Sequence, residues 1–144
     1  MNSKRASELM GISIDTIRYY ERVGVIPPIG RDENGYRNFR TNDLNWVFLA
    51  KNFKKAGMSV ESMIEFATLA QSKHDVSNAQ KDLLKEQLEE IDKKFDELNR
   101  TRDILKYKIE TYDDHVAKFK AGDMDADNTE KLWESDKFIS NDEK

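Results

Sequence analysis

Apolar residues recur at alternating spacings of four and three along the second half of the chain, from residue 84 to residue 119. A heptad pattern sustained over about five repeats, with charged residues around it, is typical of a coiled coil. We therefore expect residues 76–119 to form one long dimerisation helix. We call its apolar positions the seam: Leu84, Leu88, Ile91, Phe95, Leu98, Leu105, Ile109, Tyr112, Val116 and Phe119.

The seam implies a partner. At 1.5 Å per residue, residues 84–119 would form a rod about 54 Å long, which cannot bury its own apolar stripe. A second copy of this chain is the simplest partner. An internal hairpin is the alternative, but no turn residue interrupts Leu84 to Phe119. Arg102 occupies a seam position and is expected to fix the register of the pair, at some cost in stability.

Two short helices are predicted at the start of the chain. Residues 3–10 carry a weak helical pattern that Gly11 ends, and Ser13 is a good N-cap for a second helix that runs to Val23. In the second helix Ile14 and Ile17 form an inner stripe, with Tyr20 or Glu21 at its edge. Two short helices joined by a glycine turn predict a helix-turn-helix. The opposite stripe consists of Asp15, Arg18, Tyr19 and Arg22.

A β-hairpin is predicted at residues 29–39. Gly24 caps the preceding helix, and Pro27-Pro28 prevents the helix from continuing. Asn34-Gly35 is expected at the hairpin tip, because both residues tolerate positive φ in a tight turn. Such a hairpin would form a wing, with its polar side chains contributed by Arg31, Tyr36 and Arg37.

Two further helices are expected to supply the core of a domain of residues 1–70. Thr41 is predicted to cap a third helix over residues 42–56, and Ser59 to cap a fourth. Their aromatic and apolar side chains either pack as plain core or border a small effector site. The residues considered for that site are Trp46, Phe48, Phe53 and Met63.

Charge is divided unevenly along the chain, whose net charge is −4. Residues 1–58 hold ten Lys or Arg against six Asp or Glu, a net +4. Residues 59–119 hold ten against fourteen, and residues 120–144 hold four against eight, a net −4 each. The N-terminal part is therefore where a polyanion would bind.

Composition excludes several classes of protein. The chain has no cysteine, which removes disulfides, zinc fingers and thiolate chemistry. It has no apolar run long enough for a membrane span and no signal-peptide pattern, so a cytoplasmic protein without a membrane partner is expected. No nucleophile with its base, phosphate loop or metal cluster is evident, so we expect neither an enzyme nor a cofactor.

The acidic tail, residues 120–144, has no clear period and is expected either to dock on the dimer or to be mobile. Four of its residues match positions of a calcium loop, but Asn128 replaces the required glycine, so we expect a solvated tail. The matching residues are Asp123, Asp125, Asp127 and Glu134. His74 and His115 lie far apart in sequence and are expected to be exposed rather than metal-bound.

Three consecutive segments match one known pattern: GISIDTIRYYERVGVIPPIGRDENGYRNFR, then DLNWVFLAKNFKKAGMSVESM, then a long helix. Together they resemble the MerR family of bacterial regulators. The resemblance is close over about the first 70 residues and holds in outline over the coiled coil. TIRYYE, followed by a proline break and GYR, is its most specific part.

The resemblance implies a mainly α fold in which a winged helix-turn-helix is followed by a long helix that forms an antiparallel coiled coil. It also implies a homodimer on a pseudo-palindromic promoter site, with RNA polymerase at the same promoter and transcription controlled by distortion of the DNA. The expected contacts to double-stranded DNA come from Ser13, Thr16, Arg18, Tyr19, Arg22, Arg31, Tyr36 and Arg37.

The signal that such a regulator would sense is open. The sequence looks closest to small family members that respond to aldehydes or oxidative stress through a lone cysteine in the third helix. Asn52 occupies that position here, and an amide cannot perform thiolate chemistry. A small-molecule effector therefore stays unidentified. Two other functions are considered: an architectural or excisionase-like protein that bends DNA, and a coiled-coil adaptor that binds protein.

Overall fold

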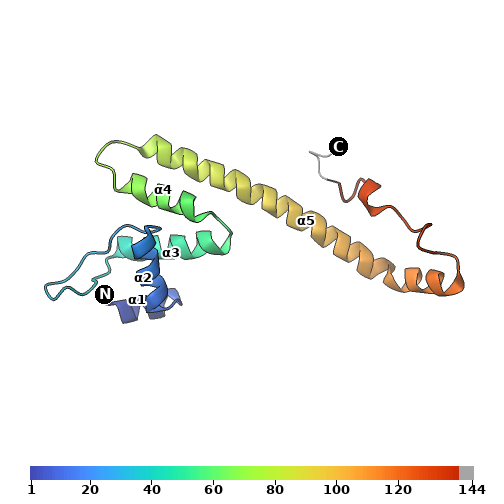
Figure 1. Cartoon of the computed structure of the whole chain (residues 1–144), viewed down its shortest axis with the longest axis horizontal. Helices are drawn as coiled ribbons and strands as arrows, with labels where there is room; N and C mark the ends of the chain where they lie inside the picture. Colours follow the sequence, from blue (N-terminus) through green and yellow to red (C-terminus); the bar gives the residue numbers. More distant parts are fainter. Residues whose placement is uncertain (140–144) are drawn as a thin grey trace. The chain divides into compact units, whose positions relative to one another are not determined.

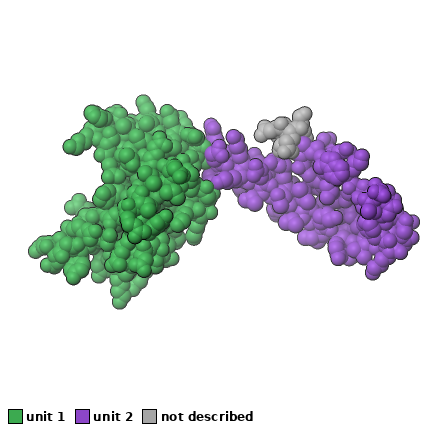
Figure 2. Space-filling view, viewed as in Figure 1, with its two compact units in different colours: residues 1–88 green, residues 89–144 purple. Residues whose placement is uncertain are grey.

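The structure is a computed structural model that describes residues 1–139 and is mainly helical, as expected (Figure 1). A first compact unit comprises residues 1–88 and a second begins at residue 89, within α5 (Figure 2). The helices are, in chain order, α1 (Ser3–Met10), α2 (Ile14–Val23), α3 (Thr41–Lys55), α4 (Val60–Ala70), α5 (Ser77–Ala121) and the short 3-10 helix η1 (Leu132–Glu134).

The turn between α1 and α2 forms at the residues that the sequence predicts. Gly11 follows α1 at φ 67°, and Gly24 follows α2 at φ 89°. Both adopt the left-handed conformation that closes a helix C-terminus and that residues with a Cβ rarely adopt. Ser13 caps α2, because its hydroxyl oxygen accepts a hydrogen bond from the Thr16 amide at 3.0 Å.

The cap of α3 differs from the expectation. Thr41 was the predicted cap, but it is the first helical residue, and Arg40 occupies the N-cap position. The carboxylate of Asp43 accepts a hydrogen bond from the Arg40 amide at 2.8 Å. A carboxylate three residues into a helix satisfies an amide that otherwise has no helical partner. The start of α3 therefore depends on Asp43 rather than on a threonine hydroxyl.

The predicted β-hairpin is wrong in its form. No β-strand forms among residues 1–139, and the wing is a loop closed by a single antiparallel bridge between Arg31 and Arg37. The backbone turns back through two hydrogen bonds of 2.8 Å, from the Asp32 amide to the Tyr36 carbonyl and from the Asn38 amide to the Gly30 carbonyl.

The tip of the wing also differs from a two-residue turn. Gly35 has φ 83°, whereas Asn34 does not have positive φ. The Asp32 carboxylate accepts hydrogen bonds from the amides of Asn34 at 2.9 Å and Tyr36 at 3.0 Å. Asparagine and aspartate often close turns through such bonds to amides two or more residues ahead. Asp32 therefore sets the turn, and only the glycine needs the left-handed conformation.

The core of the first unit joins all four N-terminal helices to the base of the wing. Ile17, Ile26 and Val47 are the largest side chains that are fully buried. Ile29 and Phe39, which lie before and after the wing, are buried in the same cluster and anchor its base. The remaining members are Ala6, Tyr20, Val25, Ala50, Met58 and Met63.

Eight of the ten seam residues of α5 are exposed in the single chain. Ile109 is 76% exposed and Leu98 is 69% exposed, while Ile91 and Val116 are half-buried. Leu83, which is adjacent to the seam in sequence, is instead buried in the first unit. Among residues 1–139, none of the helices combines the length and hydropathy that a membrane span requires. The other exposed seam residues are Leu84, Leu88, Phe95, Leu105, Tyr112 and Phe119.

The tail folds back on α5 of its own chain within the second unit. The Tyr107 hydroxyl donates a hydrogen bond to Glu130, and the Tyr107 ring meets the Phe138 ring with centroids 5.5 Å apart. His115 Nδ1 lies 3.8 Å from the other carboxylate oxygen of Glu130. In the candidate calcium loop, the Asp125 carboxylate accepts hydrogen bonds from the amides of Asp127 and Asn128. This carboxylate therefore closes a turn.

The Tyr107 contact predicts a pH dependence. The hydrogen bond to Glu130, more than desolvation or charge, raises the pKa of the Tyr107 hydroxyl. A raised pKa means that the contact is complete below the pKa of free tyrosine, about 10, and is lost as pH rises through the folded-state value. We expect Tyr107→Phe to remove one late step from a tyrosinate absorbance titration. Loss of a step at the pH of free tyrosine, about 10, would contradict the contact.

Candidate nucleic-acid interface

The two faces of α2 have opposite character. Ile17 and Tyr20 lie in the core, so Tyr20 rather than Glu21 extends the inner stripe, and burial raises the pKa of the Tyr20 hydroxyl. Arg18 points outward, with its Nη1 3.6 Å from an oxygen of the exposed Asp15. An exposed ion pair between residues three apart contributes little to stability. The Arg18 guanidinium can therefore leave Asp15 for a phosphate or a base edge at small cost.

Two cations lie near the ring of Tyr19 on the outer face of α2. The Arg22 guanidinium lies 5.5 Å from the centroid of the Tyr19 ring, and Lys54 Nζ lies 5.4 Å from it. A cation near an aromatic face is attracted by the ring quadrupole, so both contacts orient the ring. Tyr19, Arg22 and Lys54 therefore form one cationic and aromatic patch, which we call the Tyr19 patch.

Lys54 was missed by sequence reasoning. It lies in the last turn of α3, 35 positions after Tyr19 in the sequence, and only the packing of α3 beside α2 brings the two together. The single signal in the sequence was the basic pair Lys54-Lys55 at a helix end, a pattern that also suits a solvated surface.

Two hydroxyls lie at the N-terminus of α2. The oxygens of Ser13 and Thr16 are 2.8 Å apart and share a hydrogen bond. Because Ser13 also caps the helix, its hydroxyl is already held in place. The N-terminus of a helix favours phosphate. These two candidate contacts therefore lie together at an end of α2 suited to a DNA backbone.

A groove of about 640 Å³ separates the start of α1 and the face of α2 from the wing. It brings together four of the side chains predicted to bind DNA: Arg18 from α2, and Arg31, Tyr36 and Arg37 from the wing. Lys4, which the sequence did not single out, adds a further cation, and Asp32 is the acidic residue in the lining. Tyr36 is 71% exposed. The groove is therefore a cationic channel with a phenol at its rim.

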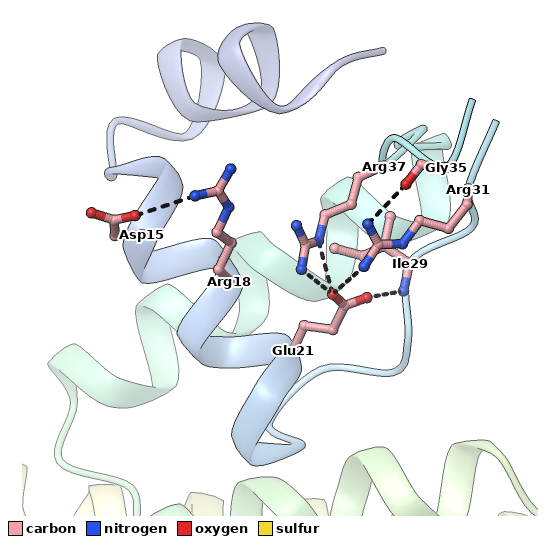
Figure 3. A network of polar contacts seen from close by, with 7 residues as sticks. All are labelled: Asp15, Arg18, Glu21, Ile29, Arg31, Gly35 and Arg37. Carbon is pink, nitrogen blue, oxygen red and sulfur yellow. Dashed lines mark hydrogen bonds and ion pairs between the residues drawn. The ribbon is translucent and has the colours of Figure 1, made fainter. Parts of the chain in front are cut away.

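Glu21 connects α2 to the wing (Figure 3). One of its carboxylate oxygens accepts from Arg37 Nε at 2.8 Å and lies 2.7 Å from Arg37 Nη2. The other accepts from the Ile29 amide at 2.6 Å. Arg31 Nη2 lies farther away, 3.8 Å from Glu21. The wing is thus attached to α2 at two points: at its base through Ile29, and on the segment that follows the tip through Arg37.

A second hollow, of about 380 Å³, lies on α3 and α4. Two of the four aromatic or apolar residues considered for an effector site, Trp46 and Phe48, line it. Met63 belongs to the core, and Phe53, like Trp46, packs against it. The ring centroids of Trp46 and Phe66 are 5.2 Å apart. The exposed side-chain amide of Asn52 donates a hydrogen bond to the backbone carbonyl of Phe48. Phe66, which the sequence did not single out, therefore belongs to this hollow.

Two family models match the chain. The model for the MerR family regulatory protein matches residues 2–39, which include α1, α2 and the wing. The model for the MerR DNA-binding region matches residues 46–107, which include most of α3, all of α4 and much of α5. The two matches follow each other in the order that the fold requires.

Known proteins with similar sequence or structure are regulators of the same kind. An uncharacterized HTH-type transcriptional regulator of Haemophilus influenzae is 35% identical, over 75% of this chain and 80% of that protein. A Listeria monocytogenes protein, described as a regulator of the MerR family, is 39% identical with a TM-score of 0.77, over 85% of this chain and 92% of that one.

A third similar protein was solved with its ligand. HiNmlR, a MerR family regulator lacking the sensor domain and bound to promoter DNA, is 33% identical with a TM-score of 0.72. The likeness covers 81% of this chain and 93% of that one. It therefore extends beyond the helix-turn-helix into the long helix.

Proposed function

This chain belongs to the MerR family of transcriptional regulators, and we propose that it binds promoter DNA through the outer face of α2 and the groove beside the wing. The observation that carries this proposal is the groove, which gathers Lys4, Arg18 and Arg31 around the phenol of Tyr36. Guanidinium, ammonium and phenol groups are the donors that hold DNA phosphates. The net charge of +4 on residues 1–58 favours the approach of DNA to this part of the chain.

The division of labour follows from where the side chains lie. A recognition helix enters the major groove, so Arg18 and Tyr19 on α2 would reach base edges or phosphates there. Tyr36 and Arg31, on the wing, would hold the DNA backbone beside the major groove. Ser13 and Thr16 would meet a phosphate at the N-terminus of α2. The Tyr19 patch would add the cations of Arg22 and Lys54.

The seam supports action as a homodimer. Regulators of the MerR family bind promoter DNA as dimers, and the seam residues of α5 lie exposed in the single chain. A two-fold pair presents two α2 helices to DNA, which suits a pseudo-palindromic site. Distortion of DNA is the control mechanism that fits the family. We propose that the distorted promoter is one that RNA polymerase contacts in the cytoplasm.

The alternatives are less well supported. The relatives reported above are transcriptional regulators rather than enzymes, which supports a non-catalytic role here. An architectural DNA-bending protein would use the same groove without sequence preference. A protein-binding adaptor would not need four cations and a phenol around one groove. The experiment below separates the three functions.

Footprinting with the full-length chain tests the proposal. The DNA flanking its own gene is the probe, and we expect protection of one pseudo-palindromic site within a promoter. Affinity should fall steeply between 50 and about 200 mM salt, because phosphate contacts release counterions. Protection without sequence preference would indicate an architectural protein. The absence of protection at low salt would overturn DNA binding and favour the adaptor.

Lys54→Ala should weaken operator binding about five- to thirty-fold, because an exposed cation over a ring contributes about 0.5–1 kcal/mol in each of the two subunits and orients Tyr19. Lys55→Ala is the control, since it removes the same charge at the next position of α3. Fluorescence anisotropy with labelled operator would compare the two variants. Equal effects of both variants would mean that Lys54 acts through its charge alone and not through the Tyr19 ring.

A further inference from the structure

The two arginines of the wing are held differently by Glu21. Arg37 presents two nitrogens to one Glu21 oxygen, at 2.8 and 2.7 Å, and its side chain is only 17% exposed. Arg31 lies 3.8 Å from the same oxygen and is 49% exposed. The Glu21 side chain itself is 13% exposed. The Arg37 contact is therefore short and shielded from water, whereas the Arg31 contact is long and open.

These differences decide which arginine can exchange partners. A charge-assisted hydrogen bond made through two nitrogens in a shielded place is strong, and removing one of its charges leaves the other unpaired. A long contact between exposed groups contributes little and is easily replaced. An incoming phosphate would therefore draw Arg31 from Glu21 at small cost, but it would have to break a good ion pair to draw Arg37.

The contact of Glu21 with the backbone also indicates that Glu21 and Arg37 hold the wing in place. Its second oxygen accepts from the Ile29 amide at the buried base of the wing. The bridge between Arg31 and Arg37 then joins the two arms of the wing. Through Arg37 and Ile29, one carboxylate on α2 holds both arms. Arg31 is meanwhile ordered by a hydrogen bond from its Nη1 to the Gly35 carbonyl at 3.1 Å.

We propose that Glu21 and Arg37 form a fixed brace that sets the wing against α2, and that Arg31 is the arginine of the wing that passes from Glu21 to a DNA phosphate. Arg37 is then a positioning residue rather than the direct DNA contact predicted from the sequence. The role of Arg31 rests on the proposed function. The brace does not, because it exists in the free protein.

The first test is amide hydrogen exchange in the free full-length protein. Arg37→Ala should speed exchange at the Asp32 and Asn38 amides, whose hydrogen bonds close the wing. Arg31→Ala should change it much less. Arg37→Lys keeps the charge but loses the paired nitrogens, so we expect an intermediate effect if the brace depends on geometry. Unchanged exchange in both Arg37 variants would overturn the brace.

The second test is the salt dependence of operator binding. Arg31→Ala should lower the slope of log K against log salt by about 1.8 for the homodimer, because each phosphate contact on duplex DNA accounts for about 0.9 and one contact is lost in each subunit. Arg37→Ala should weaken binding about ten-fold at every salt concentration and leave the slope unchanged. A slope lowered by Arg37→Ala, or unchanged by Arg31→Ala, would overturn the assignment. If the wild type itself bound no DNA, the proposed function would fail while the exchange experiment still tested the brace.

Discussion

Arg18→Ala should abolish operator binding at physiological salt while leaving the dimer intact. Arg18 lies in the groove, and its ion pair with the exposed Asp15 is weak, so little structure depends on it. A good arginine contact to a base is worth about 1–3 kcal/mol. Two subunits would lose about 2–6 kcal/mol, which corresponds to roughly a 30- to 10,000-fold weaker Kd. Fluorescence anisotropy with labelled operator measures the loss directly.

Lys85→Ala is the matched control for Arg18→Ala. Lys85 is an exposed cation on α5 within the first unit and is not part of the groove lining. Its removal takes away the same charge, so operator affinity should stay close to that of the wild type. Sedimentation of Arg18→Ala would complete the experiment, because a loss of dimer would mean that Arg18 is structural.

Ile109→Glu should dissociate the homodimer. Ile109 is a seam residue that is 76% exposed in the single chain, so its burial is expected to come from the partner. Burying such a side chain is worth about 1.5–3 kcal/mol, and each dimer has two copies. The lost 3–6 kcal/mol would weaken dimerisation roughly 100- to 10,000-fold, and a buried glutamate would weaken it further. Sedimentation velocity at micromolar concentration would show a monomer.

Asn99→Glu is the control for the seam variant. Asn99 is exposed on the same helix and lies outside the series of seam positions. It gains the same carboxylate as Ile109→Glu, but at a position expected to face water. A dimer that survives both substitutions would show that the seam is not the dimer interface. A dimer lost in both would mean that added charge alone is responsible.

The parts of the fold that were predictable depend on local rules. Gly11, Ser13 and Gly24 each act on the helix next to them, through a left-handed turn or a side-chain cap, so their roles can be inferred from a few neighbouring residues. The length of α5 follows from a period that repeats many times. Errors arose where two local rules competed, as at Thr41 and Asp43, or at Asn34 and Asp32.

The candidate interface was predictable only in part, for a different reason. The outward face of α2 follows from helical period, which placed Arg18 and Tyr19 correctly at the surface. The ion pair between Glu21 and Arg37 joins residues 16 positions apart, and Lys54 reaches Tyr19 from another helix. No pattern in the sequence distinguishes an arginine that is free to bind phosphate from one already paired with a carboxylate. That distinction needs the packed structure.

The contact between Tyr107 and the tail has a consequence for assembly. Tyr107 and His115 do not belong to the seam series, and the tail's Glu130 and Phe138 contact them within the same chain. A long helix with exposed apolar surface on two sides can bind a third and a fourth helix and form a larger bundle. Here one side is already occupied by the chain itself. Most of the seam stays exposed on α5, so the tail covers one side of the helix and leaves an apolar stripe for one partner copy, which favours a dimer over a larger bundle.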